Sequence, residues 1–239
     1  ITENNVDFTS AGIAGTGDAG NGTIALTGIT GPVLSARLYW HGIGSPTYAN
    51  SNVSIDGNPV IGANIGESST NCWGSGASVA YQADVTAYVT GDGAYAVTGM
   101  TAAGGSSNGA SIVVTFDDGD NTNNRDLAFF EGNDSDESGY PGDPAGWQAV
   151  LTPIDYGGVG TVGIQMHAAD GQNASDGPVS YSTVNSLVTI PDDASLYDGV
   201  STPTEGNGRN GHGLWDIHTH DITAAFGGVP GSVDMNLDG

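Results

Sequence analysis

The sequence has almost no positive charge. It contains no lysine and only three arginines, against 27 acidic residues, so the formal net charge is -24 over 239 residues. Such a chain has no basic patch with which to neutralise phosphates. We therefore expect it to bind no nucleic acid and to stay away from anionic membrane surfaces, while its acidic surface attracts cations.

Cysteine and long apolar runs are also scarce. Cys72 is the only cysteine, so an intrachain disulfide is impossible. No run of roughly eighteen apolar residues occurs, so we expect no insertion into a membrane. The chain begins at Ile1 without a methionine, as a secreted protein does after its signal peptide is removed, although a trimmed chain would look the same. These features favour an extracellular, cell-surface location.

Residues that build helices are few as well. Only five of the 27 acidic residues are Glu, and lysine is absent. Asp favours turns and caps, whereas Glu favours helices. Alternating and β-branched stretches recur along the chain, separated by Gly, Asn, Asp and Pro. The sequence predicts an all-β fold, an antiparallel β-sandwich or jelly roll, with no helix longer than about three turns.

Two stretches of similar sequence indicate an internal duplication. "ADVTAYV" (83–89) and "HDITAAF" (220–226) both carry an Asp, a β-branched residue and a Thr before a glycine-bounded strand. Asp84 and Asp221 are each expected to accept the free N–H groups of the following turn. This strand–turn–strand unit, present twice, predicts two packed sandwich halves. The expected divisions are a flexible N-terminal arm or donor strand (1–20), a first half (21–120) and a second half (121–239).

An ordered series of segments resembles a known group of proteins. "ARLYWHG", "VSIDGNPV", "YQADVTAYV", "GASIVVTFDD", "RDLAFFEG" and "LWDIHTHDIT" are similar to modules of large secreted surface proteins and adhesins of bacteria and archaea. The "DVT" unit is also similar to jelly-roll domains attached to glycoside hydrolases. The resemblance covers about residues 33–132 and 212–226. It implies an extracellular β-sandwich with a surface or adhesive role, and it implies no catalytic residues.

Asp216, His218 and His220 lie at alternate positions of "LWDIHTH". On a strand they share one face, while Trp215 and Ile217 share the other, so we expect the histidine face to point to solvent. A His-x-His pair can hold zinc or copper. We interpret the three residues as structural and keep a transition-metal site as the alternative. Its further ligands would come from Asp216 or from the distant His41, His167 and His212.

The acidic loop "DSDESGYPGD" favours calcium. Asp134, Asp136 and Ser138 stand at positions 1, 3 and 5 of a calcium-loop pattern, and the Tyr140 carbonyl stands at position 7. Position 12 is not Glu, so the loop is no EF-hand, but Asp143 offers a later oxygen. The alternative is that Asp, Asn and Gly simply fill loops. Calcium is the one cofactor that the sequence predicts, and two further oxygen-rich loops are residues 117–124 and 170–177.

Motifs for catalysis are missing. There is no G-x-S-x-G elbow, no pair of carboxylates is singled out, and Cys72 has no evident basic neighbour to activate it. Trp40 and Trp215 lie in strand patterns and are expected in the core. Trp73 and Trp147 lie near glycine-rich loops and are the candidate platforms for sugar stacking.

We therefore predict a non-catalytic structural protein, either a subunit of a surface layer or filament or an adhesin module. The alternatives are a secreted carbohydrate-binding module, which would bind glycans, and a glycoside hydrolase. The predicted partner is the protein itself. Val6 and Phe8 follow strand spacing within the N-terminal stretch, which would add a strand to an open sheet edge of the next copy. The competing interpretation makes this stretch a disordered leader or an edge strand of its own sandwich.

Overall fold

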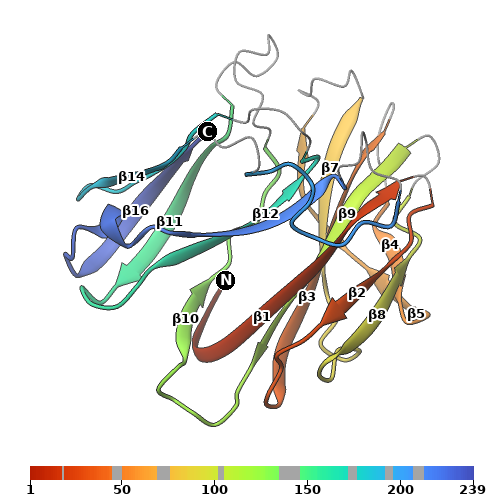
Figure 1. The fold of residues 1–239 in the computed structure, drawn as a ribbon, viewed down its shortest axis with the longest axis horizontal. Coiled ribbons are helices and arrows are strands. Elements are labelled where there is room, and N and C mark those ends of the chain that lie inside the picture. The colour runs from red at the N-terminus through yellow and green to blue at the C-terminus, as the bar shows by residue number, and fades with distance from the viewer. Residues whose placement is uncertain are drawn as a thin grey trace.

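The protein is almost entirely β-structure (Figure 1). The computed structural model describes residues 1–17, 19–44, 50–68, 76–101, 105–134, 146–171, 177–191, 196–206 and 213–239. Within these ranges every pair of named strands is antiparallel, and the one helix is the short 3-10 turn η1 (Thr223–Phe226). The predicted all-β sandwich fold is confirmed. None of the described segments forms a helix of the length and apolarity that a membrane crossing requires.

The first sandwich consists of a six-stranded and a four-stranded sheet. The six-stranded sheet has the order β10-β1-β9-β3-β7-β6, and the four-stranded sheet has the order β2-β8-β4-β5. The strand bounds are β1 (Thr2–Gly17), β2 (Gly22–Leu26), β3 (Val33–Gly44), β4 (Asn52–Ile55), β5 (Asn58–Ile61), β6 (Ala63–Ser68), β7 (Ala77–Asp84), β8 (Gly93–Thr98), β9 (Gly105–Phe116) and β10 (Arg125–Ala128).

The alternation of side chains along these strands builds the first core. Leu38 and Trp40 of β3 point inward and are fully buried, whereas Arg37 and Tyr39 on the opposite face are partly exposed. The Trp40 ring stacks on Tyr81 of the neighbouring strand with ring centroids 5.4 Å apart. Aromatic pairs at this separation add to the gain from apolar burial.

The second sandwich is smaller. Its two-stranded sheet, β12-β15, packs against a four-stranded sheet of order β11-β16-β13-β14. The second core contains Tyr181, Phe226 and Met235. The strand bounds are β11 (Gln148–Tyr156), β12 (Gly163–Ala169), β13 (Val179–Ser182), β14 (Leu187–Ile190), β15 (Trp215–Asp221) and β16 (Gly231–Asp238).

The two sandwiches are stacked, because the β12-β15 pair lies on the outer face of β1 and β9. The Ser10 hydroxyl donates to Gln165 at 2.8 Å, and Ser111 and His167 lie 2.7 Å apart. Gly109 makes this approach possible, since a Cβ there would lie 2.7 Å from the Trp215 Cβ of the second sandwich; it would also lie 2.4 Å from the Ile13 carbonyl oxygen of the adjacent strand β1. We call this contact between the sandwiches the polar layer.

The N-terminal residues form a strand of this sheet, which corrects the expectation of a flexible arm. β1 pairs with β9 from Asp7 to Gly17 and with β10 before that. Ile13 is buried in the first core, and the Glu3 carboxylate lies 2.8 Å from the Arg37 guanidinium. Main-chain and side-chain contacts therefore hold β1 inside its own sandwich. Because β10 also belongs to this sheet, the first sandwich extends past the boundary expected at residue 120.

The duplicated turn is confirmed. The Asp84 carboxylate accepts the Thr86 N–H at 2.9 Å, and the Asp221 carboxylate accepts the Thr223 N–H at 2.9 Å. Each threonine hydroxyl then accepts a backbone N–H from the neighbouring strand or its start: that of Ala36 in β3 at 2.9 Å in one copy, and that of Val162, just before β12, at 2.8 Å in the other. The repeat also extends beyond the turn, because β2, β3, β4, β5, β7 and β8 correspond in chain order and sheet position to β11, β12, β13, β14, β15 and β16.

Candidate functional site

The histidines of β15 face the inside of the second sandwich. Asp216 is fully buried and His220 is 8% exposed, while Trp215 on the opposite face is also buried. The prediction that the histidine face points to solvent is therefore wrong. The reason is that β15 is covered on both sides, by β1 and β9 on its Trp215 face and by the second core on its histidine face.

The Asp216 carboxylate holds an adjacent segment in place. It accepts hydrogen bonds from the Gly199 N–H at 2.6 Å, from the Ser201 N–H at 3.2 Å and from the Ser201 hydroxyl at 2.6 Å. A buried carboxylate needs this degree of satisfaction to remain stable away from water. Its function in this fold is to fix residues 199–201 along the edge of β15.

His220 belongs to a group of polar and sulfur atoms around Tyr197. The Tyr197 hydroxyl lies 3.2 Å from His220 Nε2 and 3.2 Å from Met166 Sδ, and the Tyr181 hydroxyl donates to the same sulfur at 2.8 Å. Burial lowers the pKa of His220, and the neighbouring His218 lowers it further. His220 is therefore held as the neutral imidazole. Sequence reasoning missed Tyr197 and Met166, since no sequence pattern reveals that Met166 lies directly opposite His218 in the β12-β15 register.

The residues of the predicted transition-metal site do not converge on one point. His218 Nε2 lies 3.8 Å from Asp216 Oδ1, and this nitrogen is buried without a hydrogen-bond partner. His41 and His167 lie outside this group, in and beside the polar layer, and His212 lies outside the described residues. In the part of the chain that the structure describes, no three His, Cys, Asp or Glu side chains are grouped so as to hold a metal ion.

His41 is buried and His167 is half-buried, and both are bonded to their surroundings. His41 lies 2.7 Å from the Ser78 hydroxyl and 3.3 Å from Asn108 Oδ1, and Asn108 in turn donates to Asp170 at 3.0 Å. The second ring nitrogen of His167 lies 3.0 Å from Gln165 Oε1. Burial lowers the pKa of each histidine to about 4, so both are neutral near pH 7.

Most of the predicted calcium loop lies outside the described residues. Asp136, Ser138, Tyr140 and Asp143 belong to this part. Asp134 is described, and it binds the start of β11: its carbonyl accepts the Trp147 indole N–H at 3.0 Å and its carboxylate accepts the Gln148 N–H at 3.1 Å.

The oxygen-rich loop at 117–124 is described. Its carboxylates bond within the loop, as where Asp120 accepts the Thr122 N–H at 3.0 Å and Asp118 accepts the Asp120 N–H at 2.8 Å. Of the loop at 170–177, residues 172–176 lie outside the described part. Calcium binding at these loops stays a prediction.

The tryptophans are mostly structural. Trp40 and Trp215 are buried, as predicted. Trp147 is half-buried and meets the Tyr197 ring edge-on with centroids 5.3 Å apart, so its ring serves the second core as well as the surface. Trp73 and Cys72 lie outside the described residues.

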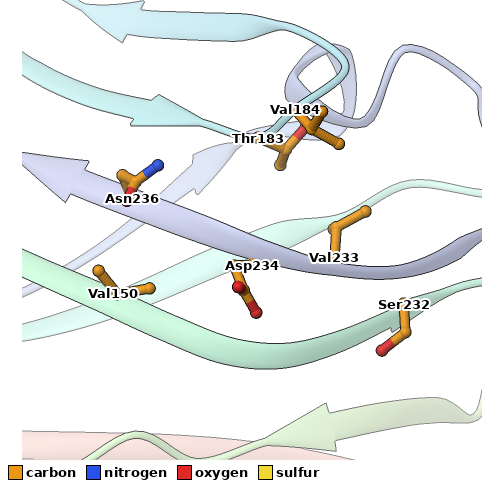
Figure 2. A pocket seen from close by; sticks show the side chains of 7 residues that line it. All are labelled: Val150, Thr183, Val184, Ser232, Val233, Asp234 and Asn236. Carbon is orange, nitrogen blue, oxygen red and sulfur yellow. The ribbon is translucent and has the colours of Figure 1, made fainter.

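An open groove crosses the outer face of the second four-stranded sheet (Figure 2). Asp234 and Asn236 project into it from β16, and the exposed Val150 projects from β11. The hydroxyl of Thr152 donates to the Asp234 carboxylate. The groove therefore offers polar side chains beside aliphatic ones, and its lining residues are Val150, Thr183, Val184, Ser232, Val233, Asp234 and Asn236.

Apart from the acidic loops, the described groups with catalytic or ligand-binding chemistry lie in the second core, the polar layer and the outer groove. In the second core and the polar layer, most of these side chains are hydrogen-bonded to other groups of the protein. No protein-family model, curated protein or solved structure matches this chain.

Proposed function

We propose that the protein is a non-catalytic, extracellular structural protein, a subunit of a surface layer or filament or an adhesin module. The observation that carries this proposal is that its reactive side chains are hydrogen-bonded to or packed against other groups of the protein. Asp216 binds a backbone segment, His41 and His167 hydrogen-bond to serine, asparagine and glutamine, and His220 packs against tyrosines. Groups bonded in this way stabilise a rigid body and are not positioned for proton transfer to a substrate.

The charge and composition support the same proposal. With a net charge of -24, the protein attracts cations, and calcium between acidic loops would relieve their mutual repulsion. The resemblance of its ordered segments to secreted surface proteins supports the extracellular location.

Electron microscopy of the full chain, in millimolar calcium and in chelator, tests the proposal. Ordered filaments or sheets in calcium support it, and a uniform field of single particles at high protein concentration contradicts the assembly. Assembly through the N-terminal strand requires an exchange, since β1 must leave β9 of its own chain before it pairs with the next copy. Under that route, polymers should not form after deletion of residues 1–15.

Carbohydrate binding is the second candidate, and the outer groove favours it. Asp234, Asn236 and Thr183 offer donors and acceptors to sugar hydroxyls, and Val150 offers an apolar surface (Figure 2). Glycan-array binding that is lost in the Asp234→Ala protein would support this function. Binding that is unchanged in that variant would exclude the groove as the site.

A further inference from the structure

The two halves of the duplication differ at one edge. In the first sandwich β3 lies between two partners, β7 on one side and β9 on the other. Its counterpart β12 pairs with β15, the counterpart of β7, and with no second strand among the described residues. In the described part of the chain, the position that β9 fills beside β3 therefore has no strand beside β12.

The register of the two copies defines this position. Arg37 pairs with Asp84 in the first sandwich, and Gly163 pairs with Asp221 in the second. Because Asp84 and Asp221 begin the same turn, Leu38 and Trp40 correspond to Ile164 and Met166. In the first sandwich, Ile112 and Ala110 of β9 lie opposite Leu38 and Trp40.

The second core is less covered where this strand is missing. Leu38 and Trp40 are fully buried, but Ile164 and Met166 are only partly buried. Among the described residues, the first core has 21 buried apolar residues and three partly buried ones, whereas the second has nine and twelve. On the facing sheet, both inner residues of β2 are buried, while the inner residues of its counterpart β11 are all partly exposed: Ala149, Leu151, Ile154 and Tyr156.

We infer that the free edge of β12 accepts an antiparallel β-strand from another polypeptide chain, uncharged and apolar at alternate positions. Main-chain hydrogen bonds to the unpaired edge and burial of alternate side chains together stabilise such an added strand. Its apolar residues lie opposite Val162, Ile164 and Met166 and cover the exposed part of the second core.

The chemistry of the accepted strand follows from β9, which occupies the equivalent position. β9 has the sequence "GSSNGASIVVTF", without a charged residue, and it buries Ala110, Ile112 and Val114. β12 has the sequence "GIQMHAA", and its histidine is neutral. An acidic strand would be repelled by a protein of net charge -24. The acceptor edge is inferred from the duplication alone, so it is independent of whether copies of the protein polymerise.

A cysteine cross-link tests both the edge and the register. The test variant combines Ile164→Cys with Cys72→Ser, so that it has a single thiol. The probe is a synthetic peptide of residues 105–116 with Ile112→Cys, which places the two thiols on directly opposed residues, a separation that suits a disulfide. We expect cross-linking with this peptide and its loss with the Val113→Cys peptide, whose thiol points to the other face.

Two controls complete the test. Leu38→Cys in the same background reports whether the peptide displaces β9 in the first sandwich, and cross-linking there instead of at position 164 would overturn the inference. A second measurement uses the unsubstituted protein and so does not depend on the variant being folded. The β9 peptide should raise the melting temperature of this protein, and a peptide of the same composition in scrambled order should not. Absence of both the cross-link and the melting shift also overturns the inference.

Discussion

His41 and His167 occupy equivalent positions in the two halves of the duplication, each four residues after the strand position paired with Asp84 or Asp221. Desolvation lowers the pKa of the buried His41 and of the half-buried His167 to about 4, so both are neutral near pH 7. When the pKa of a histidine is lower in the folded than in the unfolded protein, its contribution to stability is complete at pH values above 6.5, the ordinary pKa. This stability is lost as the pH falls from 6.5 towards 4.

We predict that the free energy of unfolding of the His167→Gln protein falls less than that of the parent between pH 6.5 and pH 4. The parent should lose about 3 kcal/mol from His167 between neutral pH and pH 4, because each pKa unit corresponds to about 1.4 kcal/mol. Chemical unfolding of both proteins at several pH values measures the difference. Parallel curves for parent and variant between pH 7 and 4 would show that His167 is not held neutral by burial.

Asp216 is the buried carboxylate on which residues 199–201 depend. Asp216→Ala leaves the Gly199 and Ser201 N–H groups without their acceptor, so we predict a loss of roughly 3 kcal/mol in the free energy of unfolding. Asp155→Ala, on the exposed face of β11, removes the same charge and serves as the control. If the two variants melt at the same temperature, the bonds of Asp216 do not stabilise the fold.

At the scale of elements, the close contact of β1 and β9 with β15 depends on glycine. A Cβ at Gly109 would lie 2.4 Å from a backbone oxygen, so neither a rotamer change nor a small side-chain shift relieves the clash. We predict that Gly109→Ala destabilises the protein by about 2 kcal/mol or more, through strain against Ile13 of β1 in the same sheet and against Trp215 of the second sandwich. Gly132→Ala is the matched control, since nothing lies within 4 Å of its added Cβ. Thermal melting that is equal for both variants would disprove the tight contact.

The elements that the sequence predicts well are those with local signals. Asp84 and Asp221 each bond within their own turn, so the duplicated turn is readable from a few neighbouring residues. β1 is different, because its glycines predict flexibility on local grounds, whereas Gly12 lies where a Cβ would come within 3.0 Å of the Ile217 Cδ1 from the second sandwich. The inward direction of His218 likewise depends on the stacking of distant sheets. Alternation along a strand defines two faces but does not reveal that both are covered.

The whole molecule combines a stacked pair of sandwiches with a strongly acidic surface. The three arginines include Arg37, which pairs with Glu3 and lies 4.3 Å from the Phe129 ring centre, so it is used inside the first sandwich. Little positive charge is left to offset the acidic loops. The stability of the whole chain should therefore depend on cations from solution.

We predict that calcium raises the melting temperature. At a concentration about 100-fold above its dissociation constant, an ion that binds only the native state adds about 2.7 kcal/mol, a shift of several degrees for a chain of this size. Melting is measured in calcium and in chelator, with constant sodium chloride so that general screening is equal. Asp136→Ala should erase most of the shift if "DSDESGYPGD" holds the ion, whereas Asp118→Ala should erase it if the loop at 117–124 does. Equal midpoints in calcium and chelator would remove calcium from the proposed role, and the acidic surface would then have to be explained by solubility alone.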